Sequence, residues 1–168
     1  MTIHSEHPFL DPHPDHARRL RGRLGGQVSL WTTGAGSDRV GLTVASMLVV
    51  LGDPPLVVGL LDPDSDLAVA LTDDDGARLV VQLLEWRHRD LAEQFAGQMP
   101  APRGPFAQAT WVQGDAGPRL ADARTWGEAT VVDARESGWS LEVRARLDGL
   151  VIGDDDEPLL HRRGRYHH

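Results

Sequence analysis

The strictest pattern in this sequence is an alternation of apolar and charged side chains over residues 139–147. A period of two places successive side chains on opposite faces of an extended chain, so this segment predicts a β-strand. One face of the strand packs on an apolar core, and the other meets water or polar partners. The apolar positions are Leu141, Val143, Ala145 and Leu147, and the charged positions are Glu142, Arg144 and Arg146.

Other apolar segments rich in β-branched residues follow one another along the chain and are separated by turns, such as the one at residues 52–55. Because strands succeed strands without regularly spaced helices, the pattern favours an antiparallel sheet over a parallel one. Closing such a sheet removes its exposed edges, so we expect a mainly β, antiparallel barrel. The predicted strands are residues 27–33, 40–51, 56–61, 78–84, 106–113, 127–135, 139–147 and 158–161, of which 40–51 is too long to stay flat and must bend.

Three short helices are expected beside these strands. The first starts at Pro14, since proline lacks the N–H group that would be unsatisfied there, and it ends at Gly25-Gly26. We interpret its four arginines as a solvated basic face. A second helix follows the turn at residues 62–66, and a third covers residues 88–96. Residues 1–13 have no periodicity and are expected to form a flexible arm, with residues 14–168 as one domain.

Composition excludes several kinds of chemistry. The chain has no cysteine, which rules out disulfides, thiolate metal ligands and a cysteine nucleophile. All 17 basic residues are arginine, so no lysine can form a Schiff base. A net charge of −8 disfavours nucleic acid as a partner. No apolar segment approaches the roughly 18 residues that span a bilayer, and no secretion signal is visible, so we expect a cytoplasmic protein without a membrane partner.

Common nucleotide-binding and hydrolase motifs are missing, since the sequence has no Gly-x-Gly-x-x-Gly, no P-loop and no Gly-x-Ser-x-Gly. His4, His7, His13 and His16 are interpreted as solvated side chains rather than metal ligands, so no metal site is expected. His88 lies on the apolar face of the third helix and is interpreted as a core or interface residue rather than a catalytic one.

The most informative segment is Gly41-Leu42-Thr43-Val44-Ala45-Ser46, which is followed by the turn Asp53-Pro54-Pro55. It resembles the flavin reductase family, which has a Gly-Leu-Thr-x-Ser-Ser strand and then an Asp-Pro-Pro turn. Further segments match in the family's order and extend the resemblance over about residues 18–166. They are residues 28–33, similar to its first barrel strand, residues 89–97, similar to its helix ending in Phe-Ala-Gly, and residues 158–166, similar to its closing strand and Gly-x-Tyr end.

The resemblance implies an antiparallel Greek-key split β-barrel with a few short flanking helices. It also implies an oxidoreductase that binds FMN, with FAD possible, and transfers a hydride from NADH or NADPH to the flavin. The cofactor carries that chemistry while the protein binds and orients it, so no catalytic acid or base is named. A homodimer with the flavin near the subunit interface is expected from the family, and so is a possible partner monooxygenase.

The resemblance also selects candidate cofactor residues. Four consecutive residues of the motif strand would face the polar edge of the flavin ring, although a twisted strand alone also explains their side chains. Trp31 and Thr32 lie on the strand that passes the ring in the family. Ser65 would bind the phosphate in the turn before the second helix, where neighbouring aspartates make a purely structural helix cap an equal alternative. Arg89 would neutralise the phosphate or would be an ordinary surface residue. The four residues of the motif strand are Thr43, Val44, Ala45 and Ser46.

One departure from the family separates the possible functions. Reductases of the family have a Gly-Asp-His stretch at the start of the long penultimate strand, and its histidine is associated with the nicotinamide side. This chain has Gly138-Trp139-Ser140 at that place, and an indole cannot offer the same hydrogen bonds as an imidazole. The alternatives to an FMN reductase are therefore a divergent, non-catalytic flavin-binding module and a deazaflavin-dependent reductase.

Overall fold

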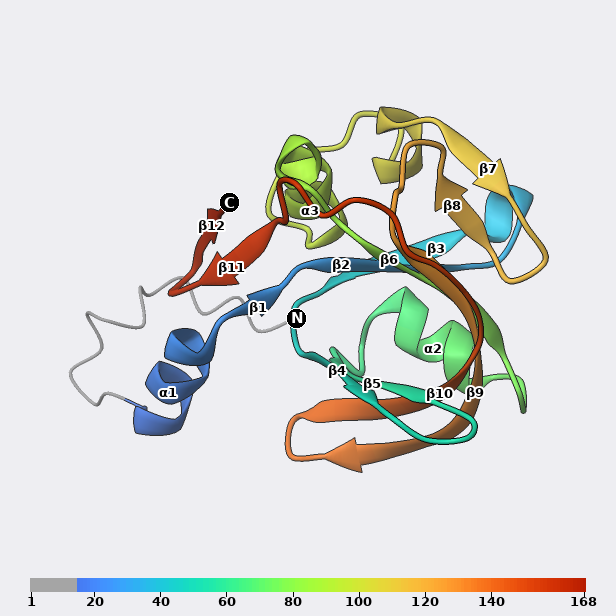
Figure 1. Cartoon of the computed structure of the whole chain (residues 1–168), viewed down its shortest axis with the longest axis horizontal. Coiled ribbons are helices and arrows are strands. Elements are labelled where there is room, and N and C mark those ends of the chain that lie inside the picture. The colour runs from blue at the N-terminus through green and yellow to red at the C-terminus, as the bar shows by residue number, and fades with distance from the viewer. Residues whose placement is uncertain (1–14) are drawn as a thin grey trace.

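The structure of the chain, a computed structural model, describes residues 15–168, and the arm expected over residues 1–13 lies outside this part. Its centre is a seven-stranded antiparallel sheet that curls on itself, with short helices beside it (Figure 1). This confirms the expected mainly β fold, an antiparallel split barrel with few helices. Along the sheet, the strands are β3 (Val40–Val44), β2 (Ser29–Thr33), β6 (Arg78–Leu83), β9 (Trp126–Ser137), β10 (Ser140–Val151), β5 (Leu56–Leu61) and β4 (Met47–Val50).

Two smaller sheets and the helices complete the described part of the chain. β1 (Gly26–Gln27) pairs with β11 (Leu160–Arg162), which pairs with β12 (Arg165–His167), and β7 (Trp111–Gln113) pairs with β8 (Pro118–Leu120). The helices are α1 (His16–Leu24), α2 (Asp66–Thr72) and α3 (Arg89–Phe95), and there are 3-10 turns at Gly36–Asp38, Trp86–His88 and Pro105–Gln108.

The segment 40–51, which the sequence predicts as one bent strand, is two strands on opposite edges of the sheet. β3 lies at one edge and β4 at the other. Only Ala45 and Ser46 separate them, so the curl of the sheet brings its two edges within two residues of each other. The Leu60 N–H donates a hydrogen bond to the Ser46 carbonyl over 3.0 Å and holds the chain at this crossing. The chain therefore does not bend within one strand here. It passes from β3, which pairs with β2, to β4, which pairs with β5.

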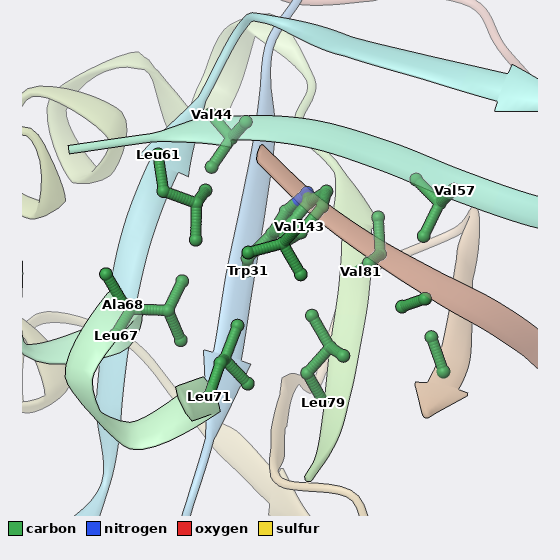
Figure 2. Close-up of a cluster of buried hydrophobic side chains, with 12 residues drawn as sticks. Trp31, Val44, Val57, Leu61, Leu67, Ala68, Leu71, Leu79, Val81 and Val143 are labelled. Carbon is green, nitrogen blue, oxygen red and sulfur yellow. The ribbon is translucent and has the colours of Figure 1, made fainter. Parts of the chain in front are cut away.

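Trp31 fills the interior of the curled sheet. Its side chain is fully buried, and its indole Nε1 donates to Ser29 Oγ over 3.1 Å. α2 lies against the interior and adds Leu67 and Leu71 to the same cluster (Figure 2). Burying one such leucine is worth about 2 kcal/mol of transfer free energy. The barrel is therefore closed around one large aromatic side chain rather than around an open channel.

A second apolar cluster lies on the opposite face of the sheet, under α3. Successive side chains of a strand point to opposite faces, so Leu30 of β2 joins this cluster while the adjacent Trp31 joins the first. α3 contributes Leu91 and Phe95. The Thr43 hydroxyl on β3 donates to the Ala92 carbonyl over 2.7 Å, which fixes α3 to the sheet.

The apolar face predicted for residues 139–147 is confirmed, because Val143 and Ala145 of β10 are fully buried in the first cluster. The strand predicted over residues 106–113 is wrong in its first half, where a 3-10 turn begins at Pro105 and only Trp111–Gln113 is extended. Strands β8 and β12 are missing from the prediction, since each has only three residues and so short a segment shows no periodicity.

All three expected helices are present, and side-chain caps set two of their starting points. α1 begins after Asp15 rather than at Pro14, because the Asp15 carboxylate accepts a hydrogen bond from the Arg18 N–H over 3.1 Å. Ser65 caps α2 in the same way, by accepting from the Ala68 N–H over 3.2 Å.

We predict that Gly59→Ala lowers the free energy of unfolding by about 2 kcal/mol through overpacking of the interior. A Cβ added at Gly59 would lie 2.5 Å from Cη2 of Trp31, whose ring is fully buried. Urea unfolding measures the loss. Gly149→Ala on β10 is the matched control, since nothing lies within 4 Å of a Cβ added there. Equal effects of the two substitutions would contradict the packing argument.

Candidate functional site

A cleft of about 850 Å³ opens beside the break between β3 and β4. This volume is typical of pockets that hold small ligands and cofactors. One wall comes from β4 and β5 and is apolar, with Met47, Leu48, Val58 and Leu60. The opposite wall comes from α1 and the turn of the β11–β12 hairpin, and we call it the arginine wall, with Arg18, Arg19, Arg21 and Arg163.

Two of the four residues predicted at the flavin edge lie in this cleft. Ala45 and Ser46 line it, and neither belongs to a strand, although the Ser46 carbonyl accepts a hydrogen bond from the Leu60 N–H of β5. Val44 is only 2% exposed and belongs to the first apolar cluster, and the Thr43 hydroxyl is bonded to the Ala92 carbonyl. The structure thus places the motif beside a cleft, but only the last two residues of the motif, Ala45 and Ser46, line that cleft.

The side chains of Trp31 and Thr32 lie away from the cleft. Both are fully buried, and the Thr32 hydroxyl donates to the Pro118 carbonyl over 2.5 Å. Within residues 15–168 these two side chains are therefore part of the buried core, where a ligand cannot reach them. The sequence pattern places them on the correct strand, but it does not reveal that α2 and β8 cover the two faces of that strand.

Ser65, the predicted phosphate ligand, is already engaged in the turn before α2. Its hydroxyl accepts from the Ala68 N–H and donates to the Asp62 carbonyl over 2.7 Å. Asp62 in turn accepts from the Asp64 N–H over 2.9 Å. These contacts are those of a helix cap, which is the structural alternative given above for this residue.

Arg89 is exposed on α3 and is not part of the lining of the cleft. Its guanidinium lies over the ring of Trp86, 5.2 Å from the ring centre, and its Nε is 3.5 Å from an oxygen of Asp90. The role of Arg89 toward a phosphate stays a prediction without support from these contacts.

The arginine wall is the feature that sequence analysis missed. The sequence pattern marks the arginines of α1 as a solvated basic face, and no periodicity links them to Arg163, which is far away in the chain. The structure joins the two segments through a hydrogen bond from the Arg163 N–H to the Gly22 carbonyl over 2.8 Å. The dense run of arginine in α1, in a chain of net charge −8, is the signal that could have indicated a site.

A second cleft, of about 760 Å³, lies between α3 and the segment after β8. Here His88 Nδ1 accepts from the Glu85 N–H over 3.1 Å, and Nε2 lies 3.1 Å from Asp122 Oδ2. Burial alone would raise the pKa of Asp122, but its hydrogen bond to His88 and the charges of His88 and Arg87 hold that pKa below its usual value. With both ring nitrogens bonded, His88 has the structural role that the sequence predicts.

Partial burial and the charges of Arg21 and His167 lower the pKa of His161, which lies in the first cleft. Burial, assisted by the charge of Glu93, raises the pKa of Tyr166 to about 12, so this phenol stays protonated at neutral pH. Burial is thus the main cause of the lowered pKa of His161, and the neighbouring positive charges add to it.

Comparison with known proteins assigns the family. The flavin reductase like domain matches residues 21–168, which is most of the chain. This chain belongs to that family.

The relatives of this flavin reductase-like chain carry consistent names. The FMN reductase (NADH) RutF of Variovorax paradoxus is 28% identical over 161 residues, which cover 95% of this chain and 87% of the relative. The 4-hydroxyphenylacetate 3-monooxygenase reductase component of Pseudomonas aeruginosa is 23% identical and covers 94% of this chain and 93% of its own. The NADH:FAD oxidoreductase SgcE6 of Streptomyces globisporus, solved with NAD and FAD fragments, has a TM-score of 0.79, 25% identity and 90% coverage of both chains.

The family's Gly-Asp-His position falls at the tip of the β9–β10 hairpin. Gly138 has φ 61°, which suits glycine at the first position of a two-residue hairpin turn. Trp139 follows it and is 89% exposed. Ser137, on the other side of the turn, lines the first cleft. The substituted position is therefore close to the cleft but is not part of its lining.

Within residues 15–168, no three His, Asp or Glu side chains are grouped so that they could hold a metal ion. No helix within these residues has the length and apolar character needed to cross a membrane.

We predict that acid destabilises the protein partly through His161. In the unfolded chain this histidine takes up a proton near its ordinary pKa of 6.5, whereas the folded protein holds the pKa lower, so lowering the pH through this range favours unfolding. The melting temperature of the wild type should fall more than that of His161→Gln between about pH 7.5 and about pH 5.5. Parallel melting curves at the two pH values test this, and an equal fall in both proteins would exclude the contribution of His161.

Proposed function

We propose that this chain is an NADH-dependent flavin reductase that binds FMN in the cleft beside the β3–β4 break. The observation that carries the proposal is the coincidence of two independent features. The chain matches the flavin reductase like domain over residues 21–168, and the motif residues Ala45 and Ser46 line a cleft of cofactor size. The proposal includes FAD in place of FMN and NADPH in place of NADH, since the hydride transfer is the same.

The residues of the cleft fit a flavin. A planar ring system needs an apolar surface, which β4 and β5 provide through side chains such as Met47 and Leu60. The polar edge of the ring needs hydrogen-bonding groups, which the backbone N–H groups of Ala45 and Ser46 can supply, whereas the Ser46 carbonyl is already bonded to the Leu60 N–H. The ribityl phosphate needs positive charge, which the arginine wall contains.

When bound, FMN would supply the chemistry by accepting a hydride from the reduced nicotinamide and passing the electrons to an acceptor. The protein's own contribution is to hold the ring against the apolar wall and to keep water from its face. No side chain in the cleft is required as a general acid or base for this reaction. A second candidate function, a flavin-binding module without turnover, is favoured by one observation, the absence of the family's histidine from the stretch Gly138-Trp139-Ser140.

We predict that purified protein shifts the visible absorption band of added FMN and that NADH bleaches this band in the absence of oxygen. Visible spectra recorded before and after addition of NADH measure both steps. Free FMN with NADH is the control for uncatalysed reduction. A shifted band that stays yellow with NADH and NADPH would contradict the reductase and favour the binding module or a deazaflavin-dependent reaction.

We further propose that two copies of the chain form a homodimer through the β4 edge of the sheet. Within residues 15–168, strand β4 pairs only with β5, and Val49, Val50 and Leu51 are 56%, 41% and 89% exposed. An unpaired apolar edge of this kind is a template for pairing with another chain. Leu48 on the same strand lines the cleft, so a partner at this edge would lie close to the flavin.

We predict that Val50→Lys converts the dimer into a monomer, because a charge on an edge strand opposes pairing between chains. Size-exclusion chromatography with light scattering measures the mass of each protein. Val132→Lys is the matched control, since Val132 is 52% exposed on β9, away from the β4 edge. A wild-type monomer, or a Val50→Lys variant that stays dimeric, would exclude this interface.

The physiological role that we propose is the supply of reduced flavin to a partner monooxygenase in the cytoplasm, where NADH is available. The relative from Pseudomonas aeruginosa is named as such a reductase component. In this proposal residues 14–168 act as one flavin reductase-like domain.

A further inference from the structure

Met47 brings a sulfur atom to the cleft beside the β3–β4 break, in a chain that contains very little sulfur. The chain has no cysteine, and its three methionines are Met1, Met47 and Met99. Met47 lines the cleft, whereas Met99 does not. Cysteine and methionine are the side chains with an oxidisable sulfur, and methionine gives the sulfoxide. Within residues 15–168, the cleft therefore has one side chain with this reactivity.

Met47 also lies at the boundary between the cleft and the first apolar cluster. Its side chain is partly buried and packs against this cluster, which contains Trp31. On β4, Met47 is paired with Gly59 of β5, and the Trp31 ring lies directly over Gly59, where an added Cβ would be 2.5 Å from it. A change in the polarity of Met47 would therefore act on the cleft and on the interior of the barrel together.

Oxidation would change the polarity of this side chain far more than its size. The sulfoxide is polar, whereas the thioether is apolar. The neighbouring side chains of the apolar wall are those of Leu48, Val58 and Leu60, and none of them can donate a hydrogen bond to a sulfoxide oxygen. A polar group that is buried without a hydrogen-bond partner is unfavourable. Oxidation of Met47 would therefore weaken the contact of this wall with a flat ring.

The proposed reaction, run in air, produces an oxidant at this place. Dioxygen takes two electrons and two protons from a reduced flavin and becomes hydrogen peroxide. A lone pair of the Met47 sulfur then attacks one oxygen of the peroxide, and the O–O bond breaks. The sulfur keeps that oxygen, and the other oxygen leaves as water with both hydrogens. The thioether has lost two electrons and the peroxide has gained two, so dioxygen is the only added reactant.

We propose that Met47 is a modification site, which is oxidised to the sulfoxide during turnover in air, and that this modification lowers the affinity of the cleft for flavin. The inference rests on the proposed function, since the reduced flavin is the source of the peroxide. The modification is reversible, because methionine sulfoxide reductases restore the thioether.

Met99 provides an internal reference for the test. It is 39% exposed and lies outside the cleft, so peroxide added to the solution should oxidise it faster than the partly buried Met47. Peroxide that forms in the cleft should reverse this order. Cleavage after arginine places the two methionines in separate peptides, residues 40–78 and residues 90–103, so mass spectrometry measures the gain of one oxygen at each methionine.

Three samples of the full chain are compared. The first turns over FMN and NADH in air, with catalase present to remove peroxide that has left the cleft. The second contains no NADH and no catalase and is treated with hydrogen peroxide. The third turns over without dioxygen, with excess FMN as the electron acceptor. We expect Met47 to be oxidised ahead of Met99 in the first sample, Met99 ahead of Met47 in the second, and neither methionine in the third.

The consequence for binding is measured by quenching of flavin fluorescence. After turnover in air, the dissociation constant for FMN should rise about tenfold, the effect of one unsatisfied polar group on an apolar surface, and methionine sulfoxide reductase should reverse the rise. Met99→Leu should show the same rise as the wild type. Met47→Leu has an apolar side chain of similar volume that cannot form a sulfoxide, so its dissociation constant should keep its own starting value during turnover.

The inference is overturned, while the proposed function stands, if NADH is consumed in air and Met47 is not oxidised ahead of Met99. It is also overturned if Met47→Leu loses affinity for FMN during turnover as the wild type does, because the loss would then not involve the sulfur. A protein that neither binds FMN nor consumes NADH overturns the proposed function and this inference together.

Discussion

The whole arrangement depends on the packing of Trp31 inside the curled sheet. The ring presses on Gly59 of β5 at a distance that leaves no space for a single added methyl group, and its Nε1 is held by Ser29. A smaller side chain would leave a void, and a larger residue at position 59 would force the strands apart. β2 and β5 are held at this spacing in a sheet whose two edge strands are joined by only Ala45 and Ser46. The cleft opens beside these two residues.

Much of the fold could be predicted because the strands are long enough to show a pattern. The alternation from Leu141 to Leu147 predicts both a strand and the face that is buried. The site is different, since its parts are distant in the chain. Arg21 and Arg163 meet only because α1 and the last hairpin pack together, and no local pattern in the sequence encodes that contact. The resemblance selects Ala45 and Ser46, which line the cleft, together with Thr43, which bonds to α3, and Val44, which is buried in the core. Their binding of a flavin stays a prediction.

The placement of charge separates the anion site that the sequence suggests, at Ser65, from the one that the structure suggests, at the arginine wall. A serine at the start of a helix is a common phosphate ligand, and Ser65 fits that pattern. Three negatively charged aspartates lie next to it in the turn, and its hydroxyl already makes two hydrogen bonds there, so the turn is unsuited to binding a phosphate. The arginines of α1 show the opposite case. In the sequence they resemble an ordinary solvated helix face, and only the fold places the C-terminal hairpin beside them.

The hairpin tip at Gly138-Trp139-Ser140 projects from the barrel and lies outside its core. Trp139 is 89% exposed, and beyond residue 130 strand β9 pairs only with β10, so the tip adds little to the core. The φ of 61° ties position 138 to glycine, whereas the side chain at position 139 has little part in folding. Position 139 is therefore open to selection for contacts near the cleft without cost to the scaffold.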